Sequence, residues 1–247
     1  MALTIASTTT SYANQPVSSH NVLMPSTRPN GDLYVMFYAG TNSTYIPPSW
    51  TSVCDSHQMP TNAFTDANFI SDMGNSFGIA YRIGSSEPAY YWCAQELDDV
   101  EPEFSAAVVY RITGSFDTNC PVVAGSATIT KAVSSSPDYY TALPPCKTIT
   151  ANSLLLGFLA TSLEARTITR PSFFNGGTSA IHTGSGELHT AHKAVTNPTI
   201  WETTDFALTD GWKTNGSLTS WVGSVEICNA DSYSSLACQQ PTFTSNN

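Results

Sequence analysis

The chain has 247 residues, of which 41% are hydrophobic and 11% are charged, and its formal net charge is −10. The apolar content is sufficient for a buried core, so the composition excludes a disordered chain. Nine Lys and Arg residues, scattered singly, cannot neutralise a run of phosphates, and an acidic exterior repels anionic lipid; we therefore expect neither nucleic acid nor a membrane as a partner.

The first 30 residues are predicted to form an extended N-terminal arm that includes a first, weakly alternating strand. Prolines at positions 16, 25 and 29 interrupt regular structure in this segment. A strand in such an arm can add to the edge of a neighbouring subunit's sheet. The expected partner contacts are the apolar and aromatic side chains of the arm, namely Leu3, Ile5, Tyr12 and Val17.

Strand patterns recur along the rest of the chain, and no segment has the apolar spacing of an amphipathic helix. Clusters of Gly, Pro, Asn and Ser separate these patterns, which is typical of a β-sandwich. We therefore predict an all-β fold. The expected strands cover residues 32–39, 77–83, 89–93, 106–112, 127–132, 153–160, 179–183, 188–195, 199–203 and 218–227.

The two halves of the chain resemble each other. Four segments of the first half match segments of the second in the same order: 31–39 with 152–160, 80–82 with 191–193, 87–92 with 197–201, and 105–110 with 220–225. No linker separates the halves. We predict one β-sandwich over residues 31–247, with pseudo-repeated halves at about 31–120 and 121–228 and a C-terminal tail over 229–247. Two halves of about four strands each would cover each other's apolar faces.

Several motifs of the chain resemble those of a known family. Gly31-Asp32-Leu33 opens a strand, and Pro47-Pro48-Ser49-Trp50-Thr51 stands where that family has a Pro-x-Gly-Trp-Thr turn. Further motifs follow in the family's order at residues 80–83, 87–92 and 107–114. Over roughly residues 25–227 the series is similar to the jelly-roll-like domain of tailed-bacteriophage structural proteins, which include decoration proteins, head fibres and tail-associated proteins.

This resemblance implies a jelly-roll fold and a virion structural protein without enzymatic activity. We expect a capsid decoration, or cement, protein that binds the outside of a phage head and stabilises it. Its partners would be the major capsid protein and copies of itself in a homotrimer. An alternative stays open, a head or tail fibre module that recognises host surface glycans. No signal-peptide or membrane-span pattern is present, so we expect synthesis in the host cytoplasm and a final location on the virion.

Two motifs could carry chemistry, and for each we favour a structural interpretation. Residues 74–78 match the letters of a G-x-S-x-G nucleophile elbow, but the elbow needs a helix after its serine and the following residues predict a strand. His189 and His192 would face opposite sides of a strand, although His182 could approach His189 across a hairpin. We therefore expect no catalytic residue, no metal site and no cofactor.

Acidic and aromatic residues suggest two further ligands. The acidic run over residues 96–103 lacks the Gly and the closing Glu of a calcium loop, so we expect a solvated loop. Seven aromatic residues could stack on sugars, although most occupy strand positions where a core needs large side chains. These are Trp50, Tyr90, Tyr91, Trp92, Trp201, Trp212 and Trp221.

The six cysteines are widely spaced and contain no CxxC pair. A chain made without an export signal meets reducing conditions, so we expect buried thiols. If disulfides form, loop spacing favours Cys228–Cys238 or Cys120–Cys146.

Overall fold

A computed structural model gives the architecture of the chain. It describes residues 1–13, 19–40, 44–45, 47, 49–55, 63–64, 76–95, 105–132, 139–141, 146–161, 167–182, 186–201, 211–214 and 218–232. Within these residues the regular structure is β-strand, apart from the short 3-10 turn η3 (Ala230–Ser232). The all-β prediction is confirmed.

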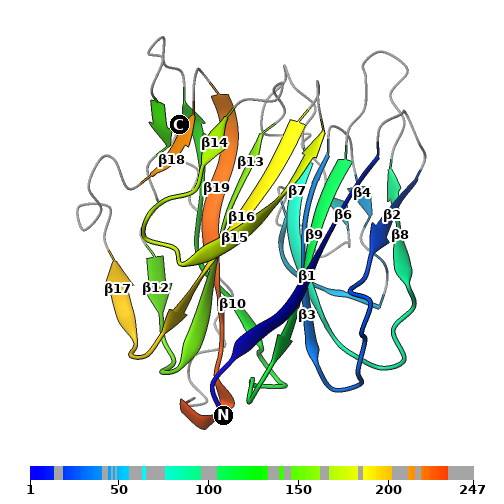
Figure 1. The fold of residues 1–247 in the computed structure, drawn as a ribbon, viewed down its shortest axis with the longest axis vertical. Coiled ribbons are helices and arrows are strands. Elements are labelled where there is room, and N and C mark those ends of the chain that lie inside the picture. The colour runs from blue at the N-terminus through cyan, green and yellow to red at the C-terminus, as the bar shows by residue number, and fades with distance from the viewer. Residues whose placement is uncertain are drawn as a thin grey trace.

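Two five-stranded antiparallel sheets face each other at the centre of the molecule (Figure 1). The N-terminal inner sheet has, in spatial order, the strands β1 (Thr4–Ala13), β9 (Ser105–Thr113), β3 (Leu33–Gly40), β7 (Ser76–Ile83) and β5 (Thr51–Asp55). The C-terminal inner sheet has, also in spatial order, the strands β10 (Val122–Ala132), β19 (Leu218–Ile227), β13 (Ser153–Thr161), β16 (Gly186–Val195) and β15 (Gly176–His182).

Smaller sheets cover the outer faces of the two inner sheets. The N-terminal outer sheet consists of β2 (Ser19–Leu23), β8 (Tyr90–Gln95), β4 (Thr44–Tyr45) and β6 (Ala63–Phe64). The C-terminal outer layer has a three-stranded sheet of β11 (Tyr139–Thr141), β18 (Trp212–Thr214) and β14 (Ile168–Thr169), and a pair formed by β12 (Cys146–Thr148) and β17 (Thr199–Trp201). The described chain is thus a stack of four sheet layers.

The sequence of β3 shows why an inner strand is apolar throughout. Leu33, Val35 and Phe37 point into the core between the inner sheets, whereas Tyr34 and Met36 point towards the outer sheet. Every residue of β3 is buried, and the same holds for β13. Because successive side chains of a strand face opposite sides, a strand covered on both sides needs apolar residues at every position.

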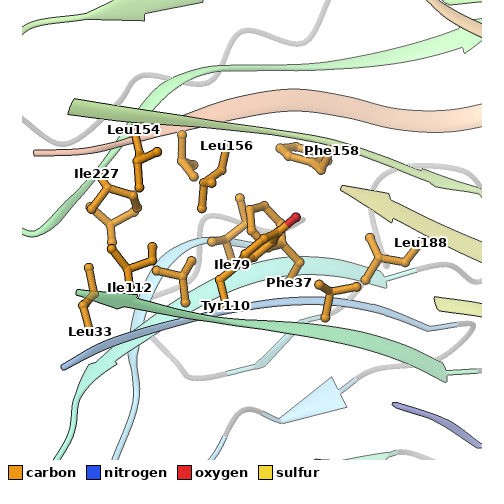
Figure 2. Close-up of a cluster of buried hydrophobic side chains, with 14 of the residues drawn as sticks. Leu33, Phe37, Ile79, Tyr110, Ile112, Leu154, Leu156, Phe158, Leu188 and Ile227 are labelled. Carbon is orange, nitrogen blue, oxygen red and sulfur yellow. The ribbon is translucent and has the colours of Figure 1, made fainter. Parts of the chain in front are cut away.

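The central core joins the two halves (Figure 2). Phe158 of β13 stacks on Phe77 of β7 with 4.3 Å between ring centroids, and its ring lies 5.9 Å from that of Phe37. A hydrogen bond of 2.6 Å joins the Tyr110 hydroxyl of β9 to Thr190 Oγ1 of β16. Burial raises the pKa of Tyr110 to about 12. Neither inner sheet can bury its inward face without the other.

Each outer layer closes a second, smaller core. On the N-terminal side, Val22 of β2, Cys93 of β8 and Trp50 pack on the outward residues of β3, β7 and β9. On the C-terminal side, Trp212 of β18 and Phe174 pack on the outward residues of β13, β16 and β19. These cores hold β8 and β16 in place, and both strands carry residues of the candidate sites below.

The two inner sheets have the same strand order along the chain. In each inner sheet, the strand that comes first along the chain lies at one edge, and its neighbour in the sheet is the strand that comes last. The strand in the middle of the sheet is the second of the five along the chain. The pairing registers also agree: Met36 pairs with Val109 and Ala80, and at the matched positions of the second half Gly157 pairs with Ser224 and Ala191.

The structure corrects the prediction of an extended N-terminal arm. β1 pairs with β9 along its whole length, and β2 pairs with β8, so both strands belong to the chain's own sheets. The main chain at Met1 also contacts η3 and its surroundings, since Asn229 Nδ2 donates to the Met1 carbonyl at 3.1 Å. The alternation of β1 is weak because it is an edge strand whose residues are mostly Thr and Ser.

The expected layering was also too simple. We predicted two facing halves of about four strands, and the structure has five strands in each inner sheet plus the outer sheets. Most of the outer strands escaped prediction, because they are only two to six residues long; β8 and β17, expected at 89–93 and 199–203, are the exceptions. Alternation over so few residues does not stand out from loop sequence.

Candidate functional site

The outward face of β2 and β8 carries large side chains in solvent. Tyr90 and Trp92 of β8 are 43% and 62% exposed, whereas Tyr91 and Cys93 between and after them turn inward. Leu23 of β2 lies opposite Tyr90, and Asn21 lies opposite Trp92. Residues directly opposite one another in an antiparallel pair share a face. We call the four residues Asn21, Leu23, Tyr90 and Trp92 the β2–β8 face.

The turn that leads into β8 is held by a buried carboxylate. Glu87 accepts hydrogen bonds from Arg82 Nε at 2.6 Å, from the Ser85 amide at 2.8 Å and from the Tyr91 hydroxyl. Burial alone would raise the pKa of Glu87, but the bonds from Tyr91 and Arg82 hold it below its ordinary value. These contacts, together with the edge-on packing of Tyr91 on Trp50, fix the orientation of β8.

The chemistry of the β2–β8 face suits binding rather than catalysis. Its aromatic rings offer rigid apolar surface with a polar handle, and the Asn21 side chain offers both a donor and an acceptor. None of the four side chains carries a charge. A partner can therefore cover this face without desolvating an ion, which favours contact with protein or with sugar rings.

A second polar arrangement lies on the outward face of the C-terminal inner sheet. Ser179 of β15 pairs with His189 of β16, and Ser179 Oγ lies 2.7 Å from His189 Nδ1. The other ring nitrogen, Nε2, lies 2.6 Å from Glu187 Oε2. Glu187 and His189 are buried, whereas Ser179 is exposed. The ring of Trp212 lies 6.1 Å from that of His189 and covers it.

Sequence reasoning missed this cluster although part of its signal was present. Glu187 directly precedes the strand predicted over residues 188–195 and lies two residues before His189, so an extended chain puts both side chains on one face. Ser179 joins them only through the hairpin register of β15 and β16, which residue spacing alone did not determine. The H-x-x-H spacing of His189 and His192 suggested a metal site, whereas His189 is hydrogen-bonded to Ser179 and Glu187.

The predicted partner contacts lie in different environments. Leu3 is 5% exposed and belongs to the central core, and Ile5 packs against that core, so neither is free to anchor the chain on a partner. Tyr12 is 54% exposed and stays a predicted contact. Val17 lies outside the described residues.

Two histidine and serine motifs have the strand geometry that we expected. His189 and His192 face opposite sides of β16: one ring lies by Trp212 and the other lies 6.3 Å from Tyr110. Ser76 begins β7, so a strand follows the serine of the G-x-S-x-G letters. The acidic run over residues 96–103 and the side chain of His182 lie outside the described part of the chain.

The aromatic residues divide between core and surface. Trp50 and Trp212 are buried, and Tyr91 and Trp201 are partly buried against the outer cores, as the core interpretation predicted. Tyr90 and Trp92 are exceptions that point to solvent. The side chain of Trp221 is outside the described set.

We expected all cysteines to be buried thiols, and this holds for only some of them. Cys93 and Cys228 are free and buried, which rules out the Cys228–Cys238 pair. Cys120 is disulfide-bonded. Its partner is therefore neither Cys93 nor Cys228, and the Cys120–Cys146 pairing stays a prediction.

The described residues contain neither a membrane-spanning helix nor a cluster of metal-binding side chains. Among the described residues no helix is long and apolar enough to cross a membrane. Over the same part of the chain no group of three or more His, Cys, Asp or Glu side chains is placed to hold a metal ion. No protein-family model matches the chain, and comparisons with curated proteins and with solved structures find no significant similarity.

Proposed function

We propose that the protein is a structural component of a tailed-phage virion and binds its partner through the β2–β8 face. The observation that carries this proposal is the exposure of Tyr90 and Trp92 beside Leu23 on one rigid sheet. Tyr and Trp are enriched where proteins bind proteins, because they bury large areas at little cost in side-chain entropy. The role is capsid decoration: the protein would bind the major capsid protein on the outside of the head.

We also infer that each half of the chain is a jelly roll and that the two halves are pseudo-repeats. In the N-terminal half the odd-numbered strands form the inner sheet and the even-numbered strands form the outer sheet, in the orders β1-β9-β3-β7-β5 and β2-β8-β4-β6. Such alternation between two sheets is characteristic of a jelly roll. The equal strand order and registers of the inner sheets support the repeat.

This proposal replaces strand addition by an extended N-terminal arm with side-chain contacts on a folded sheet. β1 and β2 already pair within the chain, and β2 contributes Asn21 and Leu23 to the proposed face. A homotrimer on the shell stays part of the proposal, with Tyr12 as a candidate contact between copies. The disulfide at Cys120 supports a protein that resides in an oxidising exterior, as the outside of a virion does.

Glycan recognition is a second candidate function, and one observation favours it. The Asn21 amide lies opposite Trp92, so a hydrogen-bonding group stands beside an exposed aromatic ring. Sugar rings present apolar C–H faces with hydroxyls at their rims, which suits stacking on an aromatic side chain next to an amide. A head or tail fibre module that binds host surface glycans would use the same face.

Co-sedimentation with undecorated capsids tests decoration. We expect wild type to bind saturably and the Tyr90→Ala/Trp92→Ala double variant to bind at least tenfold more weakly. Ile200→Ala is the matched control, because Ile200 is 59% exposed and occupies the position of β17 that sequence matching relates to Tyr90. Equal binding by the double variant would exclude this face as the contact.

The same proteins separate the two candidate functions. If none of them sediments with capsids, decoration is wrong. A glycan array probed with wild type and the Tyr90→Ala/Trp92→Ala variant then tests recognition of sugars. Binding that the double variant loses and Ile200→Ala retains would establish the glycan function, and a blank array would exclude it.

A further inference from the structure

The cluster of Ser179, His189 and Glu187 has the connectivity of a nucleophile, a base and the group that orients the base. The serine hydroxyl contacts one nitrogen of the imidazole at 2.7 Å, and the carboxylate contacts the other at 2.6 Å. Such constellations are recognised by geometry and roles rather than by fold or residue order.

The hydrogen-bond directions follow from the groups themselves. An ionised carboxylate only accepts, so Glu187 accepts from His189 Nε2–H. The neutral imidazole then has its lone pair on Nδ1, where it accepts the hydrogen bond from the Ser179 hydroxyl. This tautomer places the basic nitrogen on the serine, as general-base activation of a nucleophile requires.

The three side chains differ in solvent exposure: the base and its carboxylate are buried, and the serine is exposed, as a reacting serine must be. The Glu187 and His189 side chains are 1% and 6% exposed, so solvent does not compete for their contact. Ser179 lies on β15, the edge strand of the inner sheet, and is open to solvent. Ile181, on the same face two residues along, adds exposed apolar surface next to Glu187.

Trp212 helps to shield the imidazole from solvent. Its side chain is buried, and its ring lies 6.1 Å from that of His189. Water therefore has little access to the contact between His189 and Glu187.

We propose that Ser179, His189 and Glu187 form an esterase site that cleaves small carboxylic esters. Ser179 Oγ bonds to the carbonyl carbon while its proton passes to His189 Nδ1. The bond from that carbon to the alcohol oxygen breaks as His189 returns the proton to the leaving alcohol. Water then attacks the acyl-serine by the same proton transfers, which releases the acid and restores Ser179. Glu187 stays ionised and stabilises the imidazolium.

This activity goes beyond the proposed binding function and is an alternative to the expectation of a chain without catalytic residues. It uses the C-terminal inner sheet, whereas binding uses the N-terminal outer sheet. The two proposals therefore succeed or fail separately. Loss of ester cleavage leaves capsid or glycan binding untouched, and the reverse holds as well.

Labelling with a biotinylated fluorophosphonate tests the nucleophile directly. The serine oxygen displaces fluoride from phosphorus and forms a stable phosphonyl ester. We expect peptide mass spectrometry of the treated full chain to find the adduct on Ser179. Ser179→Ala should abolish labelling, and Ser26→Ala, the matched change at another exposed serine, should leave it unchanged. An unlabelled Ser179 in folded wild type would overturn the proposal.

Hydrolysis of p-nitrophenyl acetate measures turnover. We expect wild type and Ser26→Ala to exceed Ser179→Ala by about a hundredfold or more, as general-base assistance provides. Glu187→Gln should lower the rate while leaving Ser179 in place. Thermal melts show whether each variant folds. The conclusion depends on Ser179→Ala, because Ser179 is exposed and its substitution should not disturb the fold. Equal hydrolysis by wild type and folded Ser179→Ala would also overturn the proposal.

Discussion

His20 shows how a single buried side chain couples the stability of this fold to pH. It is a buried residue of β2, with Nδ1 3.0 Å from Ser105 Oγ and its ring 5.7 Å from that of Tyr38. Its Nε2 is buried without a hydrogen-bond partner. Burial therefore lowers the pKa of His20 from 6.5 to about 4. The folded protein keeps the ring neutral at pH values where the unfolded chain is protonated.

Acid should therefore destabilise the protein through His20. Because the pKa is lower in the folded state, stability falls as pH decreases from about 6.5 towards 4, by roughly 2–3 kcal/mol at pH 4.5. Urea unfolding at pH 7.5 and 4.5 measures the loss for wild type and for His20→Gln. We expect wild type to lose roughly 2–3 kcal/mol more than the variant; an equal loss in both would contradict the assignment.

Gly157 is the position where an added methyl group meets the core most directly. A Cβ at this residue would lie 2.3 Å from Cζ of Phe174, whose ring is buried over β13. We expect Gly157→Ala to cost about 1–3 kcal/mol in the free energy of unfolding, since overpacking forces neighbouring side chains aside. In a Phe174→Ala background the same change should cost less. A cost that does not depend on Phe174 would refute the clash as the cause.

At the scale of the element, β1 tests whether the N-terminal segment belongs to the fold. Leu3, directly before β1, is in the central core, whereas Tyr12 of β1 is 54% exposed. Thermal or urea unfolding should show a loss of about 2–4 kcal/mol for Leu3→Ala and less than about 0.5 kcal/mol for Tyr12→Ala. If both changes cost little, β1 is held loosely and its core packing is not important for stability.

This placement also affects how an N-terminal truncation is interpreted. Removing residues 1–24 takes away β1 and β2, one strand from each N-terminal sheet. In such a protein, β2 no longer covers Cys93 of β8 and β1 no longer pairs with the edge of β9. Its failure to bind a capsid would report misfolding rather than a missing anchor, so surface substitutions on the β2–β8 face are the better test.

The cysteines of β8 and of the segment after β19 should be chemically inert in the folded protein. Burial raises the pKa of the Cys93 thiol to about 12 and raises that of Cys228 as well. Only the thiolate reacts with iodoacetamide, so neither residue should be alkylated at pH 8 until urea unfolds the chain. Cys120 should stay unlabelled even in urea until a reductant is added. Peptide mass spectrometry checks all three residues, and native labelling of Cys93 would contradict its burial.

At the scale of the whole molecule, the central core should make the two halves unfold together. Phe158 of the C-terminal half contacts Phe77 and Phe37 of the N-terminal half. Phe158→Ala should cost about 3–5 kcal/mol and should speed hydrogen exchange in β3 as well as in β13. Exchange that rises in β13 alone would show that the halves are separate cooperative units.

The sequence predicted most of the inner strands, and did so best where the residues are buried on both sides. Leu33–Gly40 and Ser153–Thr161 read as continuous apolar runs, and both are central strands. The inner strand Thr51–Asp55 and most of the short outer strands, such as Thr44–Tyr45, have no such run and were missed. The edge strand β1 was recognised only as a weak alternation, and its partner β9 lies about a hundred residues away in sequence.

Alternation also limited what could be said of the candidate sites. The run Tyr90-Tyr91-Trp92-Cys93 shows which residues share a face, and period two correctly separates Tyr90 and Trp92 from Tyr91 and Cys93. It does not show which of two apolar faces another layer will cover. The same limit applies to Glu187 and His189, whose shared face was readable while their serine partner was not.

What the sequence determined by itself was the β class and the position of the apolar central strands, because these follow from local alternation and residue type. Tertiary structure alone decided that β1 and β2 complete the chain's own sheets, that Tyr90 and Trp92 stay in solvent, and that Ser179 meets His189. The physical reason is that strand pairing and layer packing are non-local. They depend on which distant strands bury each other's apolar faces, and no segment carries that information alone.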